Sequence, residues 1–229
     1  MSAALPAQLG QSNPENNLNF QQTLNVTPFS PGARGFDNRY EGIKGSPYVF
    51  ADWRRGDIIV SEKDTTLEDL LLNLNTLNQT VILQMSANSI ASAPANSVQE
   101  VIVEDGGQRR FRVYDPAVIE GDGETKPKFY EVLYEDDIVF LKAHDKFFQE
   151  ADYKGAYSAN QTADEFFDQP KYFLDLGDDG VFQQVKLRPK QLQKVLPGRK
   201  KDIKKLAKEQ GLTLYEEEEW VRLLQQLDR

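Results

Sequence analysis

The segment KFYEVLYEDDIVFLKA, residues 128–143, contains two apolar runs on either side of the acidic triplet 135–137. Tyr, Phe, Val and Ile fit a pleated, half-buried surface, and Asp tolerates turn geometry, so the segment predicts a β-hairpin. No Gly lies in the turn, which favours a loop slightly longer than two residues. A hairpin this apolar is not stable alone in water, so the surrounding chain must supply a sheet.

Alternation within the first run predicts which side chains share a face of this hairpin. One face would hold Tyr130, Val132 and Tyr134, and the other would hold Phe129, Glu131 and Leu133.

Further strands are predicted on both sides of the hairpin. Residues 98–104 and 109–114 flank the turn sequence Asp-Gly-Gly, and residues 171–176 and 181–187 flank Gly-Asp-Asp-Gly. The leucines of 67–77 fit helical spacing, but those at 70, 72 and 74 also alternate. Because hairpin-like runs lie on both sides, we predict strand, turn and strand over 68–85. Residues 147–167 are less regular and predict a loop.

The character of the chain changes to helix from Arg188. Pro189 suits a first helical position, and Gly211 ends a basic helix over 199–210. Thr213 and Glu216 match a capping box for a last helix. Its apolar stripe is Trp220, Leu223, Leu224 and Leu227. We expect this stripe to pack internally, and the alternative is that Trp220 and Leu224 bind a partner.

Residues 1–45 contain Asn, Gln, Pro, Gly and Ser with scattered apolar residues, a composition that cannot offset its ordering entropy. The sequence therefore predicts three parts: a disordered or extended arm (1–45), a β-rich body (46–187) and a helical C-terminal module (188–229). The fold class is α+β, with a mainly antiparallel body that is a meander, a small barrel-like sheet or a sandwich.

Composition excludes several classes of function. The net charge of −9 argues against a nucleic-acid-binding surface as the main function and equally against a general binder of anionic membranes. The chain has no Cys and one His, which removes disulfides, thiolate nucleophiles and sites built on two imidazoles. No apolar run approaches the ~20 residues that span a bilayer. The opening MSAALPAQLGQ has the small residues of the end of a secretory signal, but no basic start or apolar core, so it fits a trimmed signal or an ordinary N-terminus.

Candidate chemistry is sparse, and no catalytic residue, metal site or cofactor is predicted. A hydrolytic triad would have to use His144, the only histidine. The sequence contains no G-x-S-x-G motif around a nucleophilic serine, so we expect His144 to be structural. The acidic loops 120–124 and 175–180 offer oxygen ligands for calcium, but their Asp and Gly are more typical of solvated turns. The basic run 199–208 and the acidic run 216–219 are expected to face each other on neighbouring helices, with a basic patch for an acidic partner as the alternative.

Several motifs in this order resemble a group of uncharacterised, exported β-rich proteins of Bacteroidota. They are GSPYVF at 45–50 with Trp53, LNTLNQ at 74–79, FYEVLYE at 129–135, ADYKGAYSAN at 151–160, and a Lys-rich helix ahead of an acidic one. The resemblance covers about 45–229 and implies a periplasmic or cell-surface location. It brings no established activity, and it supports strands over 68–85.

We therefore expect a non-catalytic envelope protein that acts as an interaction or accessory subunit, with another envelope protein as partner. A glycan- or peptide-binding module that uses Tyr153 and Tyr157 is the second hypothesis, because exposed aromatics line such grooves. A carboxylate-dependent hydrolase is the third. The sequence does not predict the oligomeric state.

Overall fold

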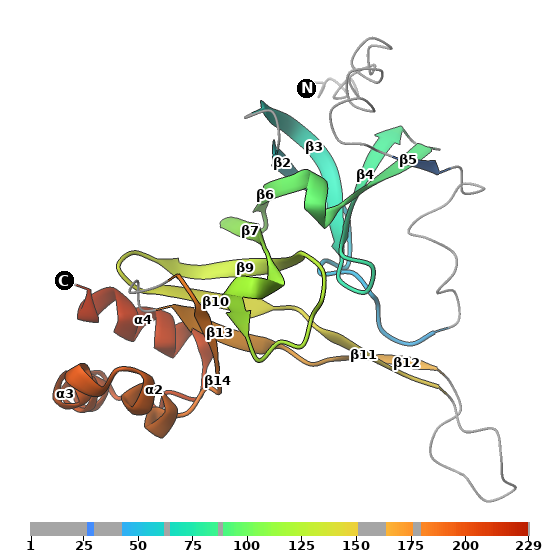
Figure 1. Ribbon diagram of the computed structural model, residues 1–229. Helices are drawn as coiled ribbons and strands as arrows, with labels where there is room; N and C mark the ends of the chain where they lie inside the picture. The colour runs from blue at the N-terminus through green and yellow to red at the C-terminus, as the bar shows by residue number, and fades with distance from the viewer. Residues whose placement is uncertain are drawn as a thin grey trace, which may run out of the picture.

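The computed structural model describes residues 27–29, 43–61, 65–86, 89–150, 164–175 and 180–228. One large sheet of 12 strands dominates it, and helices α2, α3 and α4 follow at the end of the chain (Figure 1). The strands of the large sheet are β1 (Thr27–Phe29), β2 (Arg54–Val60), β3 (Thr65–Asn75), β4 (Thr80–Ser86), β5 (Ser89–Pro94), β6 (Val98–Glu104), β7 (Gln108–Tyr114), β8 (Ile119–Glu120), β9 (Lys128–Glu135), β10 (Val139–Ala143), β13 (Lys171–Asp175) and β14 (Phe182–Val185).

A separate two-stranded sheet consists of β11 (Lys146–Gln149) and β12 (Glu165–Asp168). The helices are α2 (Pro189–Val195), α3 (Lys200–Gln210) and α4 (Glu217–Leu227), and a short 3-10 turn, Pro197–Arg199, joins the first two. The predicted class, α+β with a mainly antiparallel body and a helical C-terminus, is confirmed.

The strand order of the large sheet is β1-β5-β4-β3-β2-β6-β7-β9-β10-β13-β14-β8. Strands β2 to β5 form a meander, and β6 returns to pair with β2. Strands β6, β7, β9 and β10 form a second meander, which continues through β13 to β14. Two antiparallel meanders are thus joined edge to edge by the β2–β6 pair.

The first meander curls around its own core. Buried side chains from β2 to β7 meet Phe129 of β9 in a single apolar cluster. The turn between β3 and β4 also reaches β9, because the side-chain oxygen of Gln79 accepts a hydrogen bond from the Phe129 N–H at 3.0 Å. This half of the body is therefore a barrel-like curl of one sheet and not a sandwich of two.

The helices cover one face of the second meander. Trp220 and Leu224 of α4 and Ile203 of α3 share an apolar cluster with Phe140 of β10 and Leu174 of β13. The opposite face has its own cluster, composed of Ile119, Tyr130, Leu141, Ala143, Phe173 and Phe182. The change from strand to helix falls beside the predicted boundary at 187–188, but the helices and the strands share one core.

The predicted hairpin of residues 128–143 forms as β9 and β10, with a turn longer than two residues between them. Its register skips from Val132↔Leu141 to Tyr134↔Phe140, so Leu133 is an extra residue, a β-bulge. The predicted faces are correct for Tyr130 and Val132 but wrong for Tyr134. Beyond the bulge Tyr134 packs with the helices, because one inserted residue exchanges the two faces.

Segment 65–86 forms strands and not a helix, as predicted. Leu72 and Leu74 of β3 are buried in the curled core beside Val81 and Leu83 of β4, to which β3 pairs. Helical spacing of the leucines was outweighed because the sheet on both sides supplied hydrogen-bond partners for an extended chain.

Two other predictions need correction. Residues 147–167 were predicted as a loop, but both ends of that stretch form strands, β11 and β12. The capping box also differs: α4 begins at Glu217, and the carboxylate of Glu219, not Glu216, accepts hydrogen bonds from the backbone N–H groups of Thr213 and Leu214 at 3.1 and 2.7 Å. Gly211 ends α3 in the left-handed conformation (φ 65°), as predicted.

Trp220 and Leu224 are core residues. Both are 0% exposed, and the Trp220 indole stacks on Phe140 with ring centroids 5.5 Å apart. Its ring N–H donates to the Leu214 carbonyl at 3.0 Å. Neither side chain is accessible to a partner, so the partner-binding alternative for these residues is corrected in favour of internal packing.

We predict that Trp220→Ala lowers the free energy of unfolding by about 3–5 kcal/mol, because it removes a fully buried aromatic between helix and sheet. Chemical denaturation of the full chain measures this. The control is Tyr215→Ala, since that ring is 59% exposed and should change the midpoint little. An unchanged midpoint for Trp220→Ala would show that the helices do not depend on this core.

Candidate functional site

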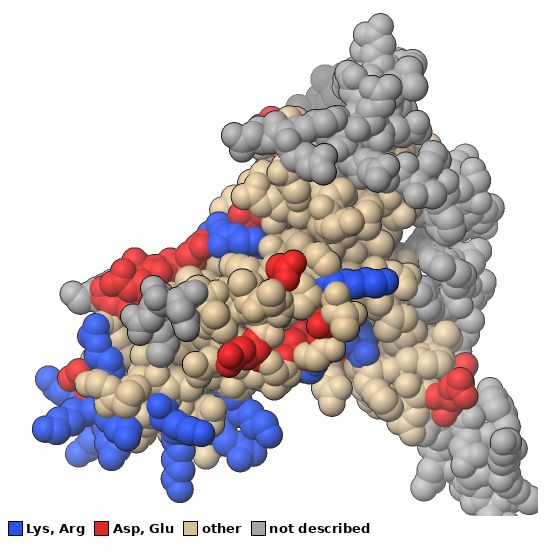
Figure 2. All heavy atoms as spheres, viewed as in Figure 1, with Lys and Arg blue, Asp and Glu red and all other residues tan. Residues whose placement is uncertain are grey.

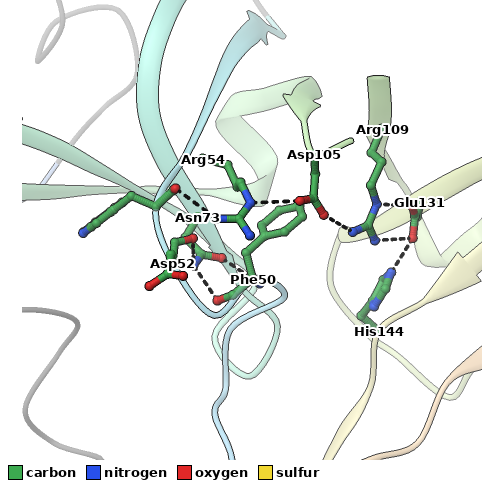
Figure 3. A network of polar contacts seen from close by, with 9 residues as sticks. Phe50, Asp52, Arg54, Asn73, Asp105, Arg109, Glu131 and His144 are labelled. Carbon is green, nitrogen blue, oxygen red and sulfur yellow. Dashed lines mark hydrogen bonds and ion pairs between the residues drawn. The ribbon is translucent and has the colours of Figure 1, made fainter. Parts of the chain in front are cut away.

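A chain of five polar side chains crosses the middle of the large sheet (Figure 3). Arg54 on β2 pairs with Asp105 at 3.0 Å, and Asp105 also pairs with Arg109 on β7 at 3.1 Å. Arg109 holds Glu131 on β9 through two hydrogen bonds of 2.6 and 2.9 Å. The His144 ring, just after β10, lies 2.6 Å from the same carboxylate. The network therefore connects both meanders through side chains.

Aromatic rings support this network from one side. The Arg109 guanidinium lies over the rings of Phe50 and Phe111, 5.0 and 5.3 Å from their centroids. The buried Asn73 amide fixes the backbone of the Phe50 segment: it accepts from the Phe50 N–H and donates to the Phe50 and Asp52 carbonyls. Arg109 is consequently held on three sides, by two rings and a carboxylate.

Glu131 is the most enclosed member of the network, with 8% of its side chain exposed. Burial alone would raise the pKa of this carboxyl, but hydrogen bonds from His144 and Arg109 outweigh burial and lower it to about 2. A carboxylate that binds a proton this weakly is a poor general base. Its hydrogen bonds to Arg109 on β7 and to His144 after β10 suit a role in holding these strands in position.

A second polar cluster closes into a ring at the end of β9. The Lys128 ammonium contacts Asp122 at 2.9 Å and Asp145 at 2.5 Å. Lys171 on β13 contacts the same two carboxylates, at 2.8 and 2.9 Å. Two cations and two anions thus alternate, and Tyr130 donates a further bond to Asp122 at 2.5 Å.

This ring corrects the prediction for the acidic loop 120–124. Asp122 is not a solvated turn residue, because its side chain is only 2% exposed. Burial would raise the Asp122 pKa, but hydrogen bonds from Lys171, Tyr130 and Lys128 outweigh burial and lower it. Burial would lower the pKa of Lys171, but its hydrogen bonds to Asp122 and Asp145 outweigh burial and raise it to about 12. Asp122 and Lys171 are therefore both charged at neutral pH.

A third cluster has the same alternating form. Glu100 on β6 contacts Arg110 and Arg112 of β7 at 2.6 and 3.6 Å, and Glu135 of β9 contacts the same two at 2.7 and 2.5 Å. This cluster, like the Arg109–Glu131 pair of the first network, joins charged side chains of neighbouring strands as cross-strand pairs. Among the residues that the structure describes, no group of His, Cys, Asp and Glu is arranged to hold a metal ion.

The most exposed apolar feature is the ribbon formed by β11 and β12, which projects from the body (Figure 1). Phe147 and Phe167 lie directly opposite each other in its register and are 53% and 40% exposed. Phe148 and Phe166 form the pair on the other face, where Phe148 is 37% exposed and Phe166 is buried. One face of the ribbon therefore presents two phenyl rings to solvent.

The ribbon is tied to the chain around it at two points, one at its base and one along β12. The Gln169 N–H donates to the Asp145 carbonyl at 2.8 Å, directly beside the Lys–Asp ring. On the β12 side, Lys44 exchanges two backbone hydrogen bonds of 2.9 Å with Asp164 and Phe166. At Gly45 any side chain would collide with the backbone, since an added Cβ would lie 2.6 Å from the Phe166 oxygen. The ribbon is thus held at a defined angle to the body.

Sequence reasoning missed Phe147 and Phe167. The pattern that could have identified them is a pair of Phe-Phe dipeptides, KFFQ and EFFD, at 146–149 and 165–168. The predicted ligand residues Tyr153 and Tyr157 lie outside the described residues. His144, expected to be structural, contacts Glu131 and packs against Phe111 with ring centroids 5.8 Å apart.

Comparison with known proteins gives no relative: no family model, no curated protein and no solved structure matches the chain. In the part of the chain that the structure describes, none of the helices combines the length and the apolar character needed to cross a membrane.

Glu131 should make the protein more sensitive to acid. Its pKa is about 2 in the folded state against an ordinary 4.5, so it stabilises the fold by on the order of 3 kcal/mol above pH ~4.5, and this contribution is lost as the pH falls toward 2. Glu131→Gln should therefore unfold more easily at pH 7 and lose less further stability between pH 4.5 and 2. Urea denaturation across this pH range measures both effects.

Glu120→Gln, at an exposed position, is the charge-matched control and should lie within about 0.5 kcal/mol of the natural protein at pH 7. Parallel pH profiles for the natural protein and Glu131→Gln would contradict the role assigned to this carboxylate.

His144→Ala should lower the free energy of unfolding by about 1–3 kcal/mol, the range for losing a hydrogen bond to a charged group. His144→Gln, which can still donate to Glu131, should recover part of that loss. A hydrolytic activity that disappears in both variants would instead make His144 a catalytic residue.

Proposed function

We propose that this protein is a non-catalytic component of the cell envelope that acts as an interaction or accessory subunit. The location follows from the resemblance of its motifs to exported proteins of Bacteroidota. The observation that carries the interaction role is the exposed phenyl pair, Phe147 and Phe167, on the projecting ribbon.

Three features of the ribbon favour a protein partner. Two large aromatics side by side supply an apolar centre of the kind that contributes most to binding energy at interfaces. A ribbon fixed at its base loses little entropy when it docks. Phe148, on the other face of the ribbon, is 37% exposed and adds further apolar surface for a partner.

The charged clusters fit a scaffold role better than a catalytic one. Of three enclosed carboxylates, Glu100 and Asp122 are each bound by two cationic side chains, and Glu131 is bound by Arg109 and the His144 ring. Paired in this way, these groups stabilise one arrangement of neighbouring strands. The sheet that carries the ribbon and the helices is therefore held in one arrangement.

We predict that Phe147→Ser with Phe167→Ser abolishes partner capture without unfolding the protein, because both rings are exposed. The tagged natural chain and the variant would be recovered from native envelopes after mild crosslinking, and the proteins retained with each would be compared by mass spectrometry. Thermal melting confirms that both are folded.

The matched control is Leu77→Ser with Tyr215→Ser, which removes two other exposed apolar side chains, 43% and 59% exposed, away from the ribbon. The proposal requires a protein that the natural chain and the control retain and the ribbon variant loses. Identical sets for all three chains would refute it.

A further inference from the structure

The helical module contains a dense group of cations. Residues 186–208 hold ten Lys and Arg and one acid, Asp202, a net charge of +9 in a chain whose total is −9. The other residues hold 17 Lys and Arg against 35 Asp and Glu. Charge is therefore segregated along the chain, and the total of −9 does not describe residues 186–208.

These cations form one surface, which we call the α2–α3 face. It consists of nine exposed residues: Lys186, Arg188, Lys190, Lys194, Lys200, Lys201, Lys204, Lys205 and Lys208. Figure 2 shows blue side chains gathered along the lower-left margin of the molecule, over the helical module, with few acidic side chains among them. Unlike the arginines of the sheet, the nine make no ion pair with any described residue.

The acids of the run 216–219, expected to face the lysines of α3, make no ion pair with them. Glu217 contacts Lys142 of β10 at 2.7 Å and accepts a hydrogen bond from Tyr172 at 3.0 Å. Glu219 accepts bonds from the backbone ahead of its own helix. The charge of the α2–α3 face is thus left for an external partner.

The chemistry of the face narrows the class of partner. Leu192, Leu196 and Ile203 are buried against the sheet, so the face lacks the apolar centre that a stable protein interface uses. Residues 186–210 contain no aromatic on which a nucleic-acid base could stack. The cations are mainly Lys, whose ammonium acts as a point charge. Arg, whose guanidinium forms bidentate hydrogen bonds with phosphates and guanine bases, is rare here, which argues against a nucleic acid as the partner.

The shape of the face also matters. It is formed by the sides of two short helices joined by the turn Pro197–Arg199, and not by a helix end that protrudes into a groove. A broad face of lysines whose large apolar side chains are buried or half-buried matches a planar anionic surface. Each Lys or Arg near such a lipid surface contributes roughly 1 kcal/mol, and this attraction falls off within a Debye length.

We propose that the α2–α3 face adsorbs to the surface of a bilayer that contains anionic phospholipid, by contact with the headgroups and without insertion. The acidic remainder of the chain opposes close approach by any other face. Adsorption therefore orients the molecule, with the helices against the lipid and the sheet away from it.

The test uses the full chain and vesicles of phosphatidylglycerol and phosphatidylcholine in equal amounts, with pure phosphatidylcholine vesicles as reference. Co-sedimentation should show binding to the anionic vesicles only, weakened by salt. Lys201→Gln with Lys204→Gln and Lys208→Gln should bind on the order of 100-fold more weakly, from about 1 kcal/mol per lysine. These side chains are exposed, so the variant should melt like the natural protein.

The control variant carries the same charge change away from the face: Lys44→Gln, Arg55→Gln and Lys126→Gln, all at exposed positions. It should retain most of the binding, and so should the ribbon variant, which separates this proposal from the previous one. Three results would overturn it: no binding of the natural chain to anionic vesicles, equal losses in both lysine variants, or tighter binding to duplex DNA than to vesicles at the same phosphate concentration.

Discussion

Strand β9 is the constraint on which the rest of the structure depends, because it takes part in all three apolar clusters. Phe129 packs in the curled core, Tyr130 packs in the cluster opposite the helices, and Leu133 packs under the helices. A strand in the middle of a sheet normally separates two environments. Here one face meets two cores, the curled core at Phe129 and the helices at Leu133, and the bulge turns Tyr134 toward the helices as well.

The charges on β9 make this arrangement specific. Lys128 and Glu131 lie on opposite faces, and each is enclosed by partners from other elements. A shift of one residue in the register would place Lys128 in the curled core and move Phe129 against Asp122. Both charges carry a large desolvation cost that their partners offset, and the misregistered alternative leaves both charges buried and unpaired. The ion pairs of β9 therefore favour the observed register over a shifted one more strongly than apolar packing alone would.

Much of the fold follows from the sequence because it depends on local patterns. Turn sequences such as Asp105-Gly106-Gly107, alternation around Leu72 and Leu74, and the Gly211 helix end each reflect a local preference that the whole structure keeps. The errors come from long-range effects. The bulge at Leu133 arises from pairing with β10, and the burial of Asp122 needs Lys171, which lies 49 residues away in the chain.

The candidate sites were the least predictable part, for the same reason. Exposed Phe147 and Phe167 look in sequence like any apolar strand residues, and only the projection of the ribbon leaves them in water. The lysines of α3 were visible in the sequence, but whether α4 neutralises them depends on the positions of Lys142 and Tyr172, which engage Glu217. Surface availability is a property of the assembled molecule and not of a local pattern.

The two exposed surfaces are mechanically linked through the sheet. The ribbon begins at Asp145, a member of the Lys–Asp ring, and Lys171 of the same ring belongs to β13. Strand β13 in turn supplies Leu174 to the core beneath the helices. Because closely packed interiors transmit displacement with little loss, the angle between ribbon and helical module is set by β10 and β13. A protein that adsorbs through its helices would therefore present the ribbon to a partner at a fixed orientation above the lipid, which is what a positioning subunit requires.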